Sequence, residues 1–245
     1  MIEHEIYSKA DTHIHTTYSD GTSRPEEVVE YVSNHTDLRV IAITDHNTAE
    51  GAFVAREHAR RLGLDVDVII GQEVTTAEGD IVGLYLKDSL PVFDSAKEAI
   101  EAIHAQDGLA VAVHPFSYWA SLAQMRGVGV RIVELPLDGV EVRNGFPANF
   151  VSNALTEWVN RRYGQKLSEL GGSDSHVPYT IGQPFTWFAG TCAADLREAI
   201  VDSRTLTGGT LWTPVSIARI LPIVLKSGLP GTVDKPVSAS EEIVS

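Results

Sequence analysis

Short apolar runs of strand length recur along the chain, and segments with helical periodicity separate most of them. The strand-like runs cover residues 40–43, 66–70, 81–86, 109–113 and 139–142. Helices are predicted over residues 26–31, 49–62 and 95–106. Because strands that alternate with helices at this spacing form parallel βα units, we expect an α/β fold around a largely parallel sheet.

Local signals mark the ends of the predicted helices. The segment from Ser23 to Glu26 has the spacing of a capping box and places a proline near the start of the first helix. Asp94 stands before the third helix as a candidate cap. Gly63 and Gly108 follow the ends of the second and third helices, as helix-terminating glycines do.

Polar residues closely follow several of the apolar runs. His46 follows the run VIAIT, and Glu73 follows DVIIG. His114 follows LAVAV, and Asn144 follows GVEV. A βα barrel produces this placement, because the carboxyl ends of its strands and the loops after them converge on one face. We therefore predict a barrel rather than an open doubly wound sheet, with a site at the C-terminal ends of the strands.

The length of the chain and its charge narrow the classes of function. With 245 residues the chain is long enough for one principal barrel domain, which we place at residues 1–228. Residues 229–245 are rich in Pro, Ser, Val and Glu, which predicts a loosely ordered or partner-dependent tail. The 33 acidic residues outnumber the 19 Lys and Arg, for a formal charge of -14, so duplex DNA, long RNA and anionic membranes are poor partners.

Cysteine content and the N-terminus indicate the compartment and the kind of metal site. Cys192 is the only cysteine, so an internal disulfide and a Cys-rich zinc site are excluded, and a reducing cytoplasm fits. The N-terminus has no basic region followed by a long apolar run, and the apolar stretch at 217–225 is too short to span a bilayer. Metal chemistry would have to use histidine and carboxylate ligands.

Histidines and acids at the predicted strand ends form a candidate metal site. His13 and His15 are two residues apart, so both rings point to the same side of an extended strand. Asp174 and His176 repeat this spacing, and Asp20 lies in a turn-forming stretch from which its carboxylate can fold back. The full set has five histidines and three acids: His13, His15, His46, His114, His176, Asp20, Glu73 and Asp174.

Each of these residues, taken alone, also fits a plainer interpretation as a core, loop or turn residue. Their gathering at strand ends favours a metal site, and nitrogen with hard oxygen ligands suits Zn, Mn or Fe. Four histidines remain and are assigned no role: His4, His35, His58 and His104. The last three lie at or near helical segments and are interpreted as solvated or structurally satisfied.

Six motifs occur in order over about two thirds of the chain. They are DTHIHTTYSDGT (11–22), IAITDHNTAEG (41–51), GQEVTT (71–76), AVHPF (112–116), EVRNG (141–145) and GGSDSH (171–176). This set resembles the PHP (polymerase and histidinol phosphatase) family of metal-dependent phosphoesterases. The resemblance implies a distorted (β/α)7 barrel with two or three divalent metal ions at the C-terminal ends of the strands, and hydrolysis of phosphate esters.

The resemblance also implies how the ligands divide among the ions. One ion would have four protein ligands: His13, His15, Glu73 and Asp174. Glu73 would bridge to a second ion bound by His114, and Asn144 stands where related sequences place a further histidine for that ion. The third ion would have three ligands: Asp20, His46 and His176. Asp80 also replaces a histidine that is common in related sequences.

A site of this composition favours an anionic substrate. Three dications set against three carboxylates leave a charge of +3, or +1 with two ions, so a phosphate group could span the ions while a metal-activated water attacks phosphorus. Glu73 and Asp174 are the expected catalytic carboxylates. Arg143 is the candidate for an extra phosphate contact, with an exposed salt-bridge arginine as the equal alternative. We expect a small phosphorylated substrate, either a phosphomonoester or a nucleotide.

Two other functions stay open at this point. An amidohydrolase-type metallohydrolase uses a similar barrel and similar ligands to cleave C–N or C–O bonds, and activity on p-nitrophenyl phosphate against amide or lactone substrates separates the two. A non-catalytic phosphate-binding module, with the tail as a partner contact, is the third hypothesis. The intact ligand set counts against it.

Overall fold

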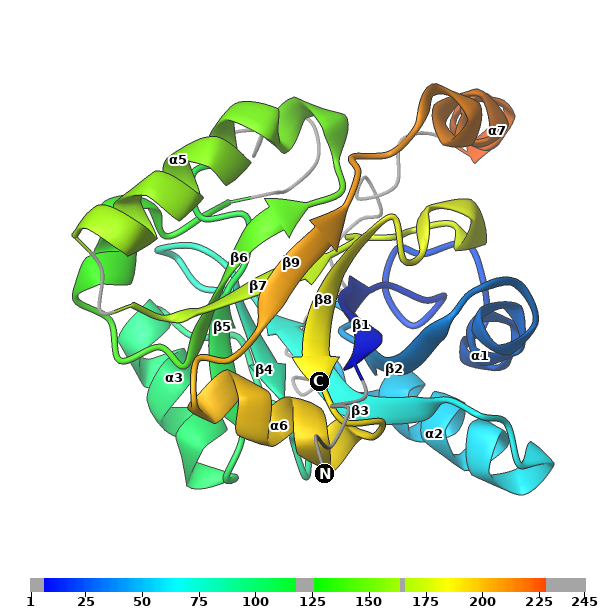
Figure 1. Cartoon of the computed structure of the whole chain (residues 1–245), viewed down its shortest axis with the longest axis horizontal. Helices are drawn as coiled ribbons and strands as arrows, with labels where there is room; N and C mark the ends of the chain where they lie inside the picture. Colours follow the sequence, from blue (N-terminus) through cyan, green and yellow to red (C-terminus); the bar gives the residue numbers. More distant parts are fainter. Residues whose placement is uncertain (1–6, 118–125, 164–165, 228–245) are drawn as a thin grey trace, which may run out of the picture.

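The computed structural model describes residues 7–117, 126–163 and 166–227 as a mixed α/β fold around one curved sheet (Figure 1). The strands in the described part are hydrogen-bonded in the order β7-β6-β5-β4-β3-β2-β1-β8-β9. Their bounds are β1 Tyr7–Ile14, β2 Leu38–Ile43, β3 Asp67–Val74, β4 Ile81–Leu84, β5 Leu109–Ala112, β6 Gly139–Asn144, β7 Ser168–Gly172, β8 Pro184–Ala189 and β9 Leu206–Gly209.

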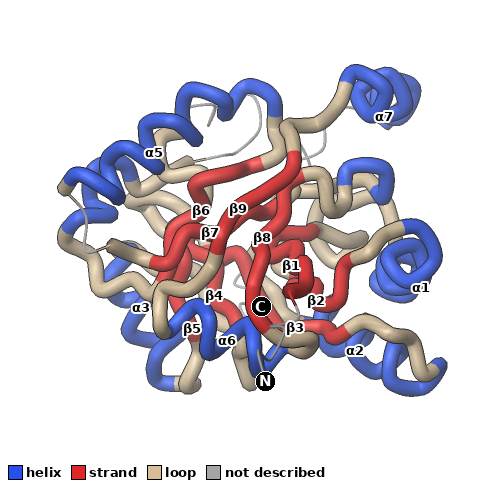
Figure 2. The backbone as a smooth tube through the Cα atoms, viewed as in Figure 1, coloured by secondary structure: helices blue, strands red, loops and turns tan. Residues whose placement is uncertain are grey.

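The sheet curls until β7 meets β1, so the strands form a nearly closed barrel (Figure 1, Figure 2). Ile14 at the end of β1 pairs in parallel with Ser175 just after β7, and the backbone N–H of His15 donates to the carbonyl of Ser175 at 2.9 Å. Gly172 permits the close approach, because a Cβ at this position would lie 2.5 Å from the Cβ of His13. The predicted fold class, a distorted α/β barrel, is confirmed.

The strand β4 departs from the parallel arrangement that the alternation of elements predicted. It follows β3 after residues 75–80, which contain no helix, and it pairs antiparallel with both β3 and β5. A parallel connection needs about a dozen residues or more, so a loop of this length returns the chain antiparallel. β8 is likewise antiparallel to β1.

Alternating side chains of the strands divide between two apolar cores. Val40 and Ile69 point into the barrel, where Leu196 of helix α6 (Ala193–Val201) packs against the same cluster. Ile41 and Val68, the sequence neighbours of those two residues, point outward to the core beneath the surrounding helices. The helix α6 contacts the barrel where β3 begins, since the carboxylate of Asp67 accepts the backbone N–H of Ala193 at 2.9 Å. This leaves the opposite end of the barrel for the polar residues.

The bounds of the helices that surround the barrel are α1 Pro25–His35, α2 Glu50–Leu62, α3 Ala96–Ala105, α5 Phe150–Arg162, α6 Ala193–Val201 and α7 Pro214–Ser227, with short 3-10 helices at Gly129–Val133, Pro147–Asn149 and Pro178–Thr180. Helices α2 and α3 begin and end within one residue of the predicted positions, α1 ends four residues later than predicted, and α5, α6 and α7 were not predicted. Gly63 ends α2 with a left-handed φ of 62°, as predicted.

Both predicted N-terminal caps are wrong by one residue. Arg24, not Ser23, is the N-cap of α1, and its backbone N–H donates to the side chain of Glu27 at 2.9 Å. Ser95, not Asp94, caps α3 by accepting the N–H of Glu98. In each case the residue at the correct position has extended backbone angles, which the sequence does not display.

No helix in the described part of the chain is long and apolar enough to cross a membrane. The predicted tail at 229–245 lies outside the described residues, so the proposed division into a domain and a tail stays a prediction.

Candidate metal centre

The carboxyl ends of five strands bring the candidate ligands to one end of the barrel. β1 supplies His13 and, directly after its end, His15; the other positions are His46 after β2, Glu73 near the end of β3, His114 after β5, and Asp174 and His176 after β7. The strands β1, β2 and β3 run parallel, and so do β5, β6 and β7. Since β4 is antiparallel to both β3 and β5, all these ends point the same way.

The backbone turns sharply at two of these positions. His114 has a φ of 32° and Asp174 a φ of 52°, both in the left-handed region that non-glycine residues rarely adopt. After His114 the chain folds into a turn in which the N–H of Ser117 donates to the His114 carbonyl at 2.8 Å. Strain of this kind persists where surrounding structure holds it, and it gathers at functional sites.

Three groups of side chains have ligand atoms within 4.8 Å of one another. The groups are His13, His15 and Asp174; His13, Glu73 and His114; and His15, Asp20, His46 and His176. His13 and His15 each belong to two groups, so the three form one continuous cluster. Its donor atoms are imidazole nitrogens and carboxylate oxygens throughout.

Glu73 lies between two of these groups. Its Oε1 is 3.2 Å from Nε2 of His114, whereas its Oε2 is 3.2 Å from Nε2 of His13 and 3.3 Å from Nε2 of His15. The side chain is 2 % exposed. A carboxylate whose two oxygens face separate sets of imidazoles has the arrangement that a bridging ligand requires.

Asp20 joins the cluster from the loop after β1, at the less buried side. Its Oδ2 is 3.0 Å from Nε2 of His176 and 3.8 Å from Nε2 of His46, and its Oδ1 is 3.6 Å from Nδ1 of His15. The rings of His15 and His176 stack with centroids 4.3 Å apart. The turn-forming stretch therefore does return this carboxylate to the histidines.

The charges of the cluster stabilise one another. Burial alone would lower the pKa of His15 and of His114, but the nearby carboxylates outweigh it and raise these pKa values to about 10 and about 9. Burial would raise the pKa of Asp174, yet His13 and His15 hold this pKa well below its usual range. The pKa of Glu73 is lowered in the same way, against the effect of burial, by His46 and His13.

The residues present fit divalent metal ions. Nε2 of His13 and Nε2 of His15 lie 3.1 Å apart, a distance at which two imidazole lone pairs repel unless a proton or a cation lies between them. Nδ1 of His15 and Nδ1 of His114 are buried without a hydrogen-bond partner among the described residues. A mixed set of imidazole and carboxylate donors suits Zn, Mn or Fe.

Asn144 lies in the cluster but takes a different part from the one expected. Its Oδ1 accepts the N–H of Phe146 and a side-chain N–H of Asn149, both at 2.9 Å. Its Nδ2 donates to Glu141 at 2.9 Å and to Asp174 at 3.1 Å. Because the N–H of Phe146 can only donate, the amide is oriented with its nitrogen toward the carboxylates and its oxygen away from them.

Arg143 is not brought to the cluster. Its guanidinium donates to the carbonyl of Gly209 in β9 at 3.1 Å. The pairing of β6 with β7 slips between Glu141 and Arg143, which inserts Val142 as a bulge. The bulge interrupts the alternation of side chains, so Glu141 and Asn144 face the cluster and Arg143 does not. The expected phosphate contact of Arg143 therefore has no support in this arrangement.

Glu141 is the residue of this site that the sequence reasoning missed. Its Oε1 lies 3.1 Å from Nδ1 of His13, and its Oε2 accepts the backbone N–H of His114 at 2.9 Å. The side chain is 2 % exposed. The signal was an acid between two valines inside an apolar strand, where a charge needs a partner.

Asp80, noted in the sequence as a replacement for a histidine, is buried beside the group of His13, Glu73 and His114, called the inner group below. Burial and the adjacent charge of Glu73 raise the pKa of Asp80 to about 7. One of its oxygens accepts the backbone N–H of Arg126 at 3.1 Å. Asp80 is therefore a second carboxyl group, after that of Glu73, in the surroundings of His114.

Comparison with known proteins matches the chain to one family. A family profile described as PHP domain matches residues 11–113, and a profile described as PHP-associated matches residues 164–205. An uncharacterized protein of Methanocaldococcus jannaschii is 38 % identical over 158 residues, which cover 60 % of this chain and 88 % of that protein. The 5'-3' exoribonuclease Rnm of Escherichia coli is 40 % identical over 88 residues, 34 % of this chain and 29 % of that enzyme.

A solved structure shares the fold. It is a two-domain protein of Bacteroides vulgatus that contains a predicted PHP-like metal-dependent phosphoesterase, similar with a TM-score of 0.66 at 22 % identity. The similarity covers 85 % of this chain and 66 % of that one. At this identity it supports the arrangement of strands and helices alone.

Proposed function

We propose that this chain, which belongs to the PHP domain family, is a metal-dependent phosphoesterase that hydrolyses a small phosphorylated substrate. The position of Glu73 carries the proposal, because its Oε2 lies 3.2 and 3.3 Å from the imidazoles of His13 and His15, while its Oε1 lies 3.2 Å from the imidazole of His114. Two adjacent cation sites that share a carboxylate suit the attacking and leaving oxygens of a phosphoryl group.

The ions would divide among the three groups, with the shared residues His13 and His15 assigned to the first ion and Glu73 shared between the first and the second. One would be held by His13, His15, Asp174 and Glu73, a second by Glu73 and His114, and a third by Asp20, His46 and His176. When bound, such ions lower the pKa of water and offset the charge of the phosphate.

The protein residues around these groups hold them in place. Glu141 fixes the ring of His13 through Nδ1, and Asn144 connects Glu141 to Asp174. Such supporting hydrogen bonds orient ligands and raise their basicity. Substrate would approach from the side of His46 and His176, whose side chains are 25 % and 12 % exposed, since the inner group is closed to solvent.

Among small phosphorylated substrates, the similarity to the exoribonuclease Rnm supports a nucleotide or a short nucleic-acid end as a candidate. The net charge of -14 disfavours a long polyanion in the same site. Both considerations leave nucleoside phosphates as the first substrates to test.

The test is hydrolysis of p-nitrophenyl phosphate, bis-p-nitrophenyl phosphate and nucleoside phosphates with added Mn or Zn, beside amide and lactone substrates. We expect release of phosphate or alcohol from one of the phosphate esters, loss of this activity in excess EDTA, and recovery with metal. Turnover of the amide or lactone with no phosphate ester cleaved would move the protein to the amidohydrolase-type reaction. Full turnover in EDTA, with metal absence verified by elemental analysis, would refute the role of the ions.

A further inference from the structure

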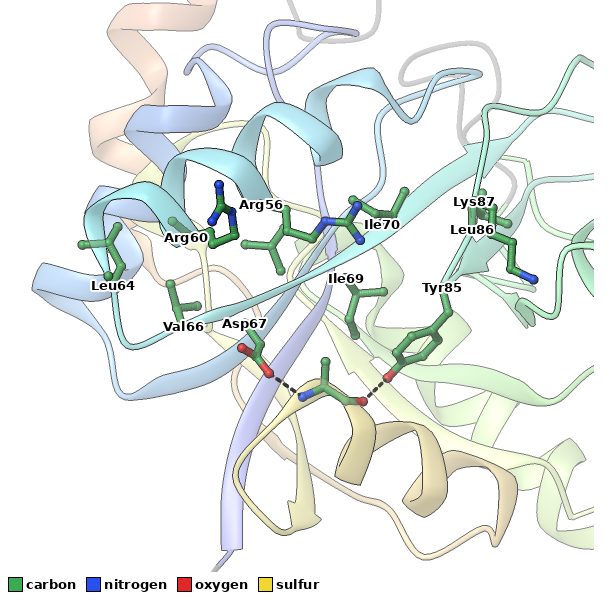
Figure 3. A pocket seen from close by; sticks show the side chains of 14 residues that line it. Arg56, Arg60, Leu64, Val66, Asp67, Ile69, Ile70, Tyr85, Leu86 and Lys87 are labelled. Atoms are coloured by element: carbon green, nitrogen blue, oxygen red, sulfur yellow. Dashed lines mark hydrogen bonds between the residues drawn. The ribbon is translucent and has the colours of Figure 1, made fainter.

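A cavity of about 600 Å³ lies beside the start of β3, at the end of this strand opposite to Glu73 (Figure 3). Its walls come from the C-terminal half of α2, the first residues of β3, the segment at the end of β4 and the start of α6. Ile70 in its lining precedes Glu73 by three residues, about 10 Å along an extended strand, and none of the candidate metal ligands lines the cavity. The cavity is therefore separate from the metal centre.

The direct connection from β3 to β4 explains the cavity. In a regular βα repeat a helix would follow β3 and cover its outer face beside α2. Residues 75–80 contain no helix, so part of this face lacks such a cover. Val68 and Ile70 of β3, with Val66 before it and Leu86 after β4, give the cavity an apolar floor.

Three cations line the cavity, and two of them form no ion pair among the described residues, although the charge of Arg56 also interacts with that of Glu57. Arg60 is held by Glu57, whose two carboxylate oxygens accept its N–H groups at 2.9 and 2.8 Å. Neither Arg56 nor Lys87 forms an ion pair within the described ranges, and the guanidinium of Arg56 lies 5.5 Å from the ring centroid of Phe53. Although the chain has a net charge of -14, Arg56 and Lys87 make the surface around this cavity locally positive.

The wall opposite α2 is fixed by hydrogen bonds to Ala193 at the start of α6. The hydroxyl of Tyr85 donates to its carbonyl at 2.8 Å, and the carboxylate of Asp67 accepts its N–H at 2.9 Å (Figure 3). Asp67, the acid among the lining residues, is thereby turned to a backbone amide rather than to the cations. This wall is formed in advance of any ligand.

We propose that the cavity binds a small anion that carries an apolar group, such as an alkyl carboxylate or an aryl sulfonate. The apolar group would lie on the floor formed by Val68, Ile70 and Leu86, and the anionic group would contact Arg56 and Lys87. Burial of the apolar group and charge-assisted hydrogen bonds both contribute to binding. An inorganic anion gains only the second contribution and a neutral alcohol only the first, so both should bind weakly.

The probe is 1-anilinonaphthalene-8-sulfonate, an aryl sulfonate whose fluorescence rises in an apolar site. It is titrated into the full chain, the double variant Arg56→Ala/Lys87→Ala, and a control, Arg24→Ala/Lys97→Ala, which removes two exposed cations elsewhere. We expect Kd to rise about tenfold in the first variant and to stay unchanged in the control. Octanoate should displace the probe, whereas 1-octanol and inorganic phosphate should not.

Three results would overturn the proposal. One is parental probe binding by the Arg56→Ala/Lys87→Ala protein, with its fold verified by circular dichroism. Another is loss of probe binding in Trp158→Ala, which removes an exposed aromatic side chain of α5, because the probe would then report that surface. The third is displacement by phosphate or 1-octanol as effective as that by octanoate. Glu73→Gln should bind the probe as the parent does, whatever its hydrolytic activity.

Discussion

The two halves of the metal centre differ in their access to water. In the inner half the side chains of Glu73, His13 and His114 are 1–2 % exposed, whereas in the outer half those of His46 and His176 are 25 % and 12 % exposed. When a buried charge loses its ionic partner, no water is present to solvate the charge that remains. Removing one member of a buried pair therefore costs more free energy than removing one member of an exposed pair. We therefore expect the inner half to control metal binding and folding together, and the outer half to control metal exchange and substrate access.

The largest effect is expected for Glu73→Gln in the inner half. The substitution keeps the shape of the side chain but removes the charge that two adjacent cations would share, so their repulsion is less compensated. Turnover of the preferred phosphate ester should fall on the order of 10³-fold, and the protein should retain fewer ions. Activity assays and elemental analysis of both proteins measure the change.

The matched control is His58→Gln, because His58 lies outside the cluster and contacts Glu30 at 2.7 Å. Its activity should remain within about twofold of the parent, since contacts of His58 with Glu30 and Arg61 at the surface contribute little and lie outside the cluster. If Glu73→Gln keeps parental metal content and activity, the assignment of the inner half is wrong.

A smaller effect is expected for Asp20→Asn in the outer half. The carboxylate of Asp20 is within 3.8 Å of three imidazole nitrogens, and its replacement should release one ion while the inner half stays loaded. Because water can partly replace this ligand, turnover should fall by about 10–100-fold, less than for Glu73→Gln. Added Mn should restore part of the rate. An equal loss in both variants, without rescue, would show that the two halves act as one unit.

The metal-free protein should lose thermal stability as the pH rises above 7. The pKa values of His15 and His114 are raised above the unfolded value of 6.5, to about 10 and about 9, so their stabilising charge is present at low pH and lost between about pH 6.5 and 10. The lowered pKa of Asp174 affects stability in the acidic range. The stabilising charge of this carboxylate is present near neutral pH and is lost as the pH falls below about 3.8.

Melting curves of the EDTA-treated protein measure this dependence. Tm should fall by several degrees between pH 7 and pH 10, while the metal-loaded protein changes less, because bound cations replace the protonated imidazoles. A metal-free Tm that is constant or rises over this range would contradict the charge pairing described for the cluster.

The sequence predicted those site residues whose placement follows from strand periodicity. His13 and His15 face the same way because they alternate along β1, and Asp174 and His176 come together again after β7. The apolar run of β4 was also predicted, but its direction depends on the length of the connection from β3. A run of apolar residues has no direction, so pattern alone could not supply it.

The parts that could not be predicted depend on pairing between strands. Val142 forms a bulge only against β7, and this one residue exchanges the positions of Arg143 and Asn144 relative to the cluster. Glu141 lies in an apolar run, but its buried carboxylate pairs with His13, which is 128 residues away in sequence. Contacts of such separation leave little local trace in a single sequence.

The smallest effect on activity, and the sharpest test of the inner half, is expected for Asn144→His. Asn144 makes four hydrogen bonds in which its oxygen faces away from the carboxylates, so the group of His13, Glu73 and His114 gains no ligand from it. An imidazole at this position would offer a nitrogen lone pair toward Glu141 and Asp174, and should tighten the ion bound by His114. Metal content after dialysis should rise toward one further ion, with turnover changed less than about tenfold.

Asn144→Asp is the control, since it adds charge without an imidazole. A parental metal content in the Asn144→His protein, with an unchanged fold, would mean that the inner half is already complete without this residue.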